Sequence, residues 1–181
     1  MNHLNTIGCH RAFEHGLDKI AETAPTEGCF VEVGIYTGGS ASHLTKIAER
    51  RNQKIFLYDT FSGLPYKDEI DHHKVGEFSY TDYDFIKESL PYAEVIKGVF
   101  PESAVEMPSV AFAHLDVDQY KSYYDCITYL KPKMVSGGIM FFDDYELDGA
   151  KKAIDELIGV ENLKFVTFDW APRVNKVYTV F

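Results

Sequence analysis

Short strand-like runs alternate with stretches of helical periodicity through most of the chain. Five such runs precede residue 143, at 29–33, 55–58, 93–98, 110–115 and 138–142. The early runs are almost continuously apolar, which is typical of parallel strands that helices cover on both faces. The alternation therefore predicts an α/β fold built on a doubly wound, mostly parallel sheet.

Helical periodicity fills the segments between these runs, and two further runs, KFVTF and KVYTVF, close the chain. We expect these last two to pair as an antiparallel hairpin, which brings the predicted sheet to seven strands. Thr81 is the predicted N-cap of the third helix, and SGG at 136–138 is predicted to form a turn. The predicted helices cover residues 8–23, 40–51, 81–90, 122–130 and 148–157.

The length and composition fit a single globular domain over residues 1–181, since 45% of the residues are hydrophobic and 25% are charged. A net charge of −10 argues against a nucleic-acid partner and against binding to anionic membranes. No apolar stretch approaches the roughly 18 residues of a membrane span, and the N-terminus lacks the apolar core of a signal peptide. We therefore expect a cytoplasmic protein without a membrane partner.

The cysteines support a reducing compartment. There are three of them, Cys9, Cys29 and Cys126, and no CxxC motif. An odd number without a paired motif argues against a disulfide framework. Cys29 and Cys126 fall in apolar patterns, so we expect both to be buried as small hydrophobic side chains.

A glycine-rich turn, VEVGIYTGGS at residues 31–40, follows the first predicted strand. Nicotinamide dinucleotide sites use G-x-G-x-x-G at this place, with the pyrophosphate on the helix N-terminus. Here the second glycine of that fingerprint is missing, and Glu32 stands two residues before Gly34. A carboxylate is a poor neighbour for a pyrophosphate but suits a cationic ligand. The alternative for Glu32, which lies inside the strand pattern, is a buried salt-bridge partner. S-adenosylmethionine fits, because it carries a ribose, a sulfonium and an ammonium but no phosphate.

Acidic residues end or follow four of the first five predicted strands. They are Glu32, Asp59, Asp116 with Asp118 nearby, and the pair Asp143 and Asp144. Open α/β sheets bind ligands beyond the carboxyl ends of their strands, and an acidic residue after the second strand accepts hydrogen bonds from ribose hydroxyls. Asp116, Asp143 and Asp144 would instead share a hard divalent cation such as Mg²⁺. For Asp118, a helix N-cap is as reasonable as a functional role.

These motifs together resemble the class I S-adenosylmethionine-dependent methyltransferases, and most closely the macrocin O-methyltransferase (TylF/MycF-type) family. The likeness begins with E-x-G-x-x-x-G-x-S and runs from about residue 8 to the end of the chain. The glycine turn is also similar to that of metal-dependent catechol-type O-methyltransferases. The blocks that carry the resemblance are DTFSGLP (59–65), HHKVGEF (72–78), LDVDQYKSYYD (115–125), LKPKMVSGGIMFFDDY (130–145) and DGAKKAIDEL (148–157).

The resemblance implies a Rossmann-like methyltransferase that transfers a methyl group to a hydroxyl, within a vicinal diol, of a sugar or natural-product acceptor. It implies S-adenosyl-L-methionine and Mg²⁺ as cofactors, a small-molecule partner and a homodimer. The Mg²⁺ ligands would be Asp116, Asp143 and Asp144, and Asp116 would also border the cofactor. The other implied cofactor contacts are Glu32, Gly34, Tyr36, Gly38 and Ser40 around the methionine part, Asp59 on the ribose, Thr60 and Phe61 near the adenosine, and Gly98 and Phe100 near the adenine.

The general base departs from the catechol-type pattern, which places a lysine three residues after the first metal aspartate. Gln119 stands at that position, and Lys121 is off the pattern. Asp116 is our first candidate for the base and Asp118 the second. His72 and His73, in a long segment without periodicity at 59–80, are further candidates, with a solvated loop position as the alternative. His43 and His114 are interpreted as packing residues.

Three other functions compete with this interpretation. A nicotinamide-dependent oxidoreductase is disfavoured by the absent G-x-G-x-x-G motif. A catalytically silent cofactor-binding protein of the same fold is disfavoured by the intact Asp116, Asp143 and Asp144. A catechol-type acceptor in place of a sugar needs only a different pocket, because the fold does not determine the acceptor.

Overall fold

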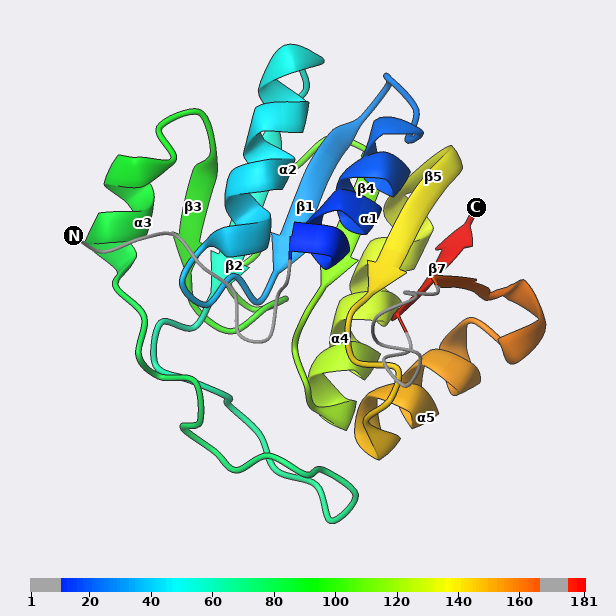
Figure 1. Cartoon of the computed structure of the whole chain (residues 1–181). Helices are drawn as coiled ribbons and strands as arrows, with labels where there is room; N and C mark the ends of the chain where they lie inside the picture. Colours follow the sequence, from blue (N-terminus) through cyan, green and yellow to red (C-terminus); the bar gives the residue numbers. More distant parts are fainter. Residues whose placement is uncertain (1–10, 167–175) are drawn as a thin grey trace.

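The strands form one seven-stranded sheet in a computed structural model that describes residues 11–166 and 176–181. The strand order is β3-β2-β1-β4-β5-β7-β6. Strands β1 to β5 pair in parallel, whereas β7 runs antiparallel to both β5 and β6 (Figure 1). The strands are β1 (Cys29–Val33), β2 (Ile55–Asp59), β3 (Glu94–Lys97), β4 (Val110–Leu115), β5 (Met134–Phe142), β6 (Lys164–Val166) and β7 (Lys176–Val180). The predicted fold class is confirmed, as is the closing hairpin within the described residues.

The helices pack on both faces of the sheet, so the winding is double, as predicted. Among the described residues, two apolar cores lie on opposite faces: one collects Tyr123 and Ile154 from α4 and α5, and the other Leu44 and Ile86 from α2 and α3. The helices are α1 (Arg11–Glu22), α2 (Gly39–Arg50), α3 (Tyr83–Ser89), α4 (Tyr120–Leu130) and α5 (Asp148–Leu157), with 3-10 turns η1 (Lys131–Lys133) and η2 (Val160–Asn162). Residues 8–10 of the first predicted helix lie outside the described residues.

The central strands explain why apolar runs without alternation occur in this sequence. Every residue of β1 and β4 is buried. Neighbouring side chains of β1 enter opposite cores, Val31 the one under α4 and α5 and Phe30 the other. Cys29 and Cys126 are buried as predicted, and burial raises the pKa of the Cys29 thiol to about 11. Cys9 lies outside the described residues.

Two local predictions are wrong. Helix α3 is capped by Asp82 and not by Thr81, because the Asp82 carboxylate accepts a hydrogen bond from the Phe85 amide at 3.0 Å. Residues 136–138 do not form a turn but lie inside β5, where the pairing with β4 jumps from Val110–Met134 to Phe112–Ile139. The extra residues bulge out of the ladder, and Gly137 takes a positive φ there, which explains the glycine pair.

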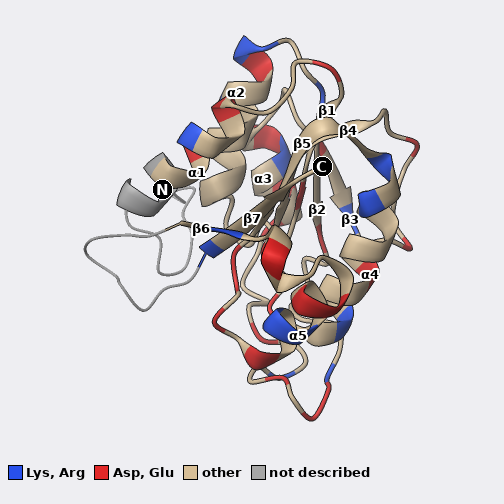
Figure 2. Cartoon of the chain, turned by 90° about the vertical axis from the view of Figure 1, so that its right-hand side faces the viewer, with Lys and Arg blue, Asp and Glu red and all other residues tan. Residues whose placement is uncertain are grey.

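The carboxyl ends of the parallel strands meet at one edge of the sheet. In Figure 1 this is the lower edge, and the segment from β2 to α3 runs beyond it. Figure 2 shows Asp and Glu recurring along the loops there. Within the described residues, no helix combines the length and apolar character that crossing a membrane requires.

Gly34 fixes how closely the ends of β1 and β4 approach each other. Its backbone has φ +85, and a Cβ added there would lie 1.7 Å from the Asp116 carbonyl oxygen. The Gly34 amide donates a hydrogen bond to the Tyr58 carbonyl, and the Asp116 amide donates one to the Val33 carbonyl. The glycine therefore makes room for the neighbouring strand, and it places the turn beside Asp116.

We expect Gly34→Ala to lower the free energy of unfolding by at least about 2 kcal/mol, because the methyl group meets backbone that cannot move aside. Gly76→Ala is the matched control, since Gly76 has φ +82 but nothing within 4 Å of an added Cβ. It should lose only about 1 kcal/mol from backbone strain. Urea unfolding of the two variants measures both free energies. Equal losses would show that the contact between position 34 and the Asp116 carbonyl does not require a glycine.

Candidate functional site

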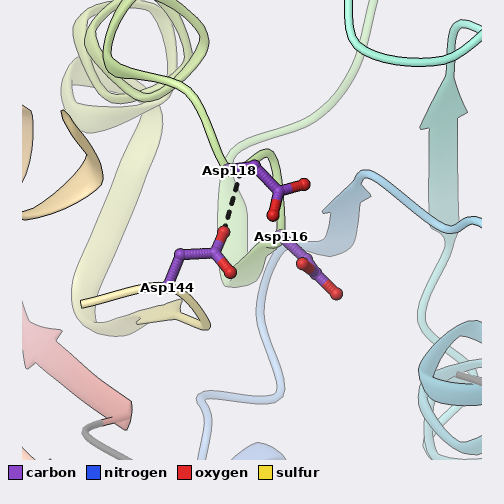
Figure 3. Close-up of side chains that lie close together, drawn as sticks. All are labelled: Asp116, Asp118 and Asp144. Carbon is purple, nitrogen blue, oxygen red and sulfur yellow. Dashed lines mark hydrogen bonds between the residues drawn. The ribbon is translucent and has the colours of Figure 1, made fainter. Parts of the chain in front are cut away.

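Three carboxylates gather where β4 and β5 end. Asp116 and Asp118 follow β4, Asp144 follows β5, and one carboxylate oxygen of each lies within 4.8 Å of the others (Figure 3). Asp118 has φ 57, a left-handed conformation that is costly outside glycine. Its amide donates to the Asp144 carboxylate at 2.9 Å, which supports this conformation. The three side chains form the acidic cluster.

The acidic cluster is electrostatically strained. Burial and the charges of the neighbouring aspartates raise the pKa of Asp116 and Asp118 well above their usual range. Burial and the Asp143 charge raise the pKa of Asp144 as well, although the charge of Lys176 and the hydrogen bonds from the Asp118 amide and Tyr123 oppose this. A bound cation would relieve the repulsion, and oxygen ligands of this kind suit Mg²⁺.

Asp143 points into a different environment from its neighbour Asp144. Its carboxylate pairs with the Lys176 ammonium at the start of β7, and its other oxygen lies 3.6 Å from His114 Nε2. Burial raises the pKa of Asp143, but Lys176 and His114 outweigh it and the pKa is lowered. The structure thus brings Asp118 into the cluster with Asp116 and Asp144, while Asp143 faces Lys176. Whether Asp143 binds a metal stays a prediction.

A buried ionic pair lies beneath the glycine turn. Glu32 on β1 accepts hydrogen bonds from Ser40 Oγ at 2.5 Å and from His114 Nδ1 at 2.9 Å, and all three side chains are buried. Burial lowers the pKa of His114, but its contacts with Asp143 and Glu32 outweigh it and raise the value to about 9. The interpretation of His114 as a packing residue captures its burial and misses its charge. The missed signal is the strand register, which pairs Glu32 with His114.

Asp59, at the end of β2, is held by the turns around it. Its Oδ2 accepts hydrogen bonds from the Ile35 and Tyr36 amides at 2.9 Å each, and its Oδ1 accepts one from the Phe61 amide at 2.7 Å. Tyr36 and Phe61 both have positive φ, which directs their amides to the carboxylate. Asp59 therefore fixes the glycine turn, and its contact with a ribose stays a prediction.

The remaining residues predicted to contact the cofactor divide into edge and core positions. Gly38 caps α2 with φ 85, and the Gly98 amide donates to the Asp59 carbonyl at 2.9 Å, so both lie at the edge. Thr60 Oγ1 donates to the Gly63 carbonyl within the following turn. The rings of Phe61 and Phe100 are buried against neighbouring tyrosines. Cofactor contacts of all five remain predictions.

The segment 60–80 brings one of its two histidines to the acidic cluster. His73 Nε2 lies 3.7 Å from Asp118 Oδ1, and His73 Nδ1 lies 2.7 Å from Glu77 Oε2. His72 instead faces Asp148 on α5 at 3.2 Å. Of the two histidines, only His73 thus lies beside the acidic cluster in the described residues, and its catalytic role stays a prediction.

Comparison with known proteins identifies the family to which this chain belongs. The family model of macrocin O-methyltransferase (TylF) matches residues 6–165. The chain belongs to the macrocin O-methyltransferase (TylF) family. This membership confirms the resemblance in the sequence motifs.

Similar proteins include natural-product enzymes from Streptomyces. Demethyldecarbamoylnovobiocin O-methyltransferase of Streptomyces niveus is 26% identical over 171 residues, covering 77% of this chain and 60% of that protein. A tetracenomycin-C 4′-O-methyltransferase of Streptomyces olivaceus that acts on a dimethoxyrhamnosyl derivative is 23% identical, covering 73% and 58%. The solved structure of the O-methyltransferase NovP has a TM-score of 0.76 at 20% identity, covering 93% and 79%. The chain thus spans about 60% of the length of these two sequence relatives.

We expect Asp59→Asn to lower the free energy of unfolding by about 2 kcal/mol, because an amide offers one oxygen to three amide donors and turns an NH₂ toward the rest. Asp82→Asn is the control, since Asp82 accepts one exposed hydrogen bond at a helix N-cap and should change stability by only about 0.5 kcal/mol. Chemical denaturation compares the two. A loss at Asp59 no larger than at Asp82 would contradict its role in fixing the turn.

Proposed function

We propose that this protein is an S-adenosylmethionine-dependent, Mg²⁺-assisted O-methyltransferase that acts on a hydroxyl of a sugar or natural-product acceptor. The observation that carries the proposal is the meeting of two features at one sheet edge. The glycine turn with Asp59 lies on β1 and β2, and the acidic cluster lies beside it on β4 and β5. Family membership supports the same chemistry.

The residues around the glycine turn fit a cofactor with hydrogen-bond donors and a positive charge. Asp59 Oδ1 accepts a single amide hydrogen bond, so it has capacity for a ribose hydroxyl. Glu32 Oε2 is buried without a hydrogen-bond partner among the described residues. That oxygen can accept a hydrogen bond from the ammonium of the cofactor, while the charge of the carboxylate is balanced by His114.

The acidic cluster fits a hard divalent cation, because Asp116, Asp118 and Asp144 offer only carboxylate oxygens and repel one another without one. Asp116 and Asp144 are the ligands common to this cluster and to the sequence prediction. Asp143 pairs with Lys176 through Oδ2, and its Oδ1 has no hydrogen-bond partner among the described residues, so a metal contact by Asp143 stays a prediction. A bound Mg²⁺ would polarise a diol of the acceptor and lower the pKa of the hydroxyl that is methylated.

The chain's own residues then have three tasks. Asp59 and the glycine turn hold the methyl donor, and the ends of β4 and β5 orient the acceptor oxygen toward it. Asp118 is partly exposed and lies beside His73, so it is suited to take the hydroxyl proton, with Asp116 as the other candidate. His73, which lies beside Asp118, would stabilise the negative charge of this carboxylate or accept the proton from it.

Several accompanying predictions are unchanged. They are a cytoplasmic location, a homodimer, a single domain, and the absence of nucleic-acid and membrane partners.

The first test is thermal melting with S-adenosylhomocysteine and, in parallel, with NADH. Ligand at about 100 times its dissociation constant should add about 2.7 kcal/mol of stability. We expect a rise with S-adenosylhomocysteine and none with NADH. The reverse result would favour an oxidoreductase, and no rise with either would favour a silent fold.

The acceptor class is tested by transfer of a labelled methyl group from S-adenosylmethionine to thymidine diphosphate rhamnose, a rhamnosylated natural product and catechol. We expect transfer to a rhamnose hydroxyl with Mg²⁺ and loss of at least about 90% of it with EDTA. Preferred transfer to catechol would contradict a sugar acceptor and favour a catechol-type acceptor. Full activity in EDTA would show that methyl transfer does not need a divalent metal.

Asp144→Asn should reduce methyl transfer by at least about 100-fold while the dissociation constant for S-adenosylhomocysteine stays within about threefold. The reason is that Asp144 lies in the acidic cluster and not on the glycine turn. Asp125→Asn is the control, because Asp125 pairs with Lys121 on the surface of α4. Equal loss of methyl transfer and cofactor affinity in Asp144→Asn would contradict the division of the site into a cofactor half at the glycine turn and a metal half at the acidic cluster.

A further inference from the structure

The segment 60–80 is anchored to the sheet edge by Gln119, the residue at the position of the catechol-type lysine. Gln119 is completely buried. Its Oε1 accepts a hydrogen bond from the Tyr66 amide at 3.0 Å, and its Nε2 donates to the Tyr66 carbonyl. One side chain thus satisfies both backbone groups of a residue that lies 53 positions earlier.

Asp71 forms a second anchor from the same segment. Its Oδ1 accepts a hydrogen bond from the Tyr120 amide at 2.8 Å, in the first turn of α4, where the Gln119 side chain provides no cap. The same oxygen would lie 2.3 Å from a Cβ added at Gly149, so the segment also rests on α5. A loop residue therefore completes the N-terminus of one helix and packs on another.

The base of the segment is closed by its own backbone. The Leu64 amide donates to the Glu77 carbonyl, and the Gly76 amide donates to the Leu64 carbonyl, both at 2.9 Å. Position 63 has no room for a side chain beside these hydrogen bonds, because a Cβ there would lie 2.5 Å from the Glu77 carbonyl oxygen. With its ends joined and two anchors between them, the long loop has a defined position.

This position places two rings between the halves of the site. His73 lies beside Asp118, and its ring packs edge-on against Phe78 with centroids 5.0 Å apart. Phe78 in turn meets the ring of Tyr36 in the glycine turn at 6.2 Å. Tyr36, Phe78 and His73 form a continuous wall from the glycine turn to the acidic cluster, and each side chain is partly exposed.

We propose that Gln119 is a positioning residue for the acceptor. By holding Tyr66, and together with Asp71, it docks the segment 60–80 so that His73 and Phe78 form the acceptor-side wall of the site. The role in acceptor binding rests on the proposed function, whereas the docking itself does not. A polar aromatic wall of this kind suits a sugar ring, which presents both C–H and hydroxyl groups.

Gln119→Met tests the docking, since methionine has a similar shape but can neither donate to nor accept from the Tyr66 backbone in this way. Hydrogen exchange of the Tyr66 amide should accelerate by roughly tenfold or more, while amides of β1 and β4 stay unchanged. The His73 ring resonances should move toward exposed values as contact with Phe78 is lost. Lys121→Ala is the control, because Lys121 lies over the Tyr66 ring at 4.8 Å without touching its backbone groups.

The functional readout is methyl transfer to thymidine diphosphate rhamnose and catechol. In Gln119→Met the KM for the transferred acceptor should rise at least about tenfold while the dissociation constant for S-adenosylhomocysteine stays within about threefold. Asp71→Ala changes an anchor outside the core and should also raise the KM for the acceptor while the dissociation constant for S-adenosylhomocysteine stays within about threefold. It keeps the test decisive if Gln119→Met does not fold.

Unchanged exchange at Tyr66, unchanged His73 resonances, or equal losses of acceptor and cofactor binding would each overturn the positioning role. If the wild-type protein neither binds S-adenosylhomocysteine nor transfers a methyl group, the proposed function fails. The exchange and resonance measurements then still decide whether Gln119 docks the segment.

Discussion

Mutual repulsion among carboxylates at one sheet edge is the constraint on which the rest of the site depends. Asp116, Asp118, Asp143 and Asp144 follow two adjacent strands, and burial strengthens their repulsion. Lys176 and His114 both face Asp143, and the pKa of Asp143 is lowered. The charge of Lys176 also acts on Asp116, Asp118 and Asp144, but their pKa values stay raised, so it offsets their repulsion only in part. A cation from solution would relieve the repulsion that remains.

The sequence was sufficient for the sheet and for the edge that carries the site. Strands β1, β2, β4 and the second half of β5 are identifiable because both faces of each are covered, which leaves apolar runs. The edge strand β3 is mostly exposed or half-buried and carries a weaker signal. Parallel strands end at the same edge, so Asp59, Asp116 and Asp144 could be brought together without knowledge of any contact. The close approach of the Asp116 carbonyl to Gly34 could not be predicted, because the turn alone does not show which backbone passes beside it.

The contacts that refine the site could not be predicted, because each joins distant positions through geometry alone. Lys176 reaches Asp143 across 33 positions only because β7 inserts antiparallel beside β5. Gln119 bonds to the backbone of Tyr66, and a backbone partner leaves no mark in the sequence. Asp82 caps α3 in place of Thr81 by a difference of one residue, which local pattern does not resolve.

A crystal structure with S-adenosylhomocysteine and Mn²⁺, with anomalous data for the metal, would show whether cofactor and metal bind side by side at this sheet edge. We expect the ribose hydroxyls on the Asp59 carboxylate and one anomalous peak bound by Asp116 and Asp144. That peak would lie on the acceptor side of the cofactor. A cofactor bound away from the glycine turn, or a saturating Mn²⁺ concentration that gives no peak at the acidic cluster, would contradict this expectation.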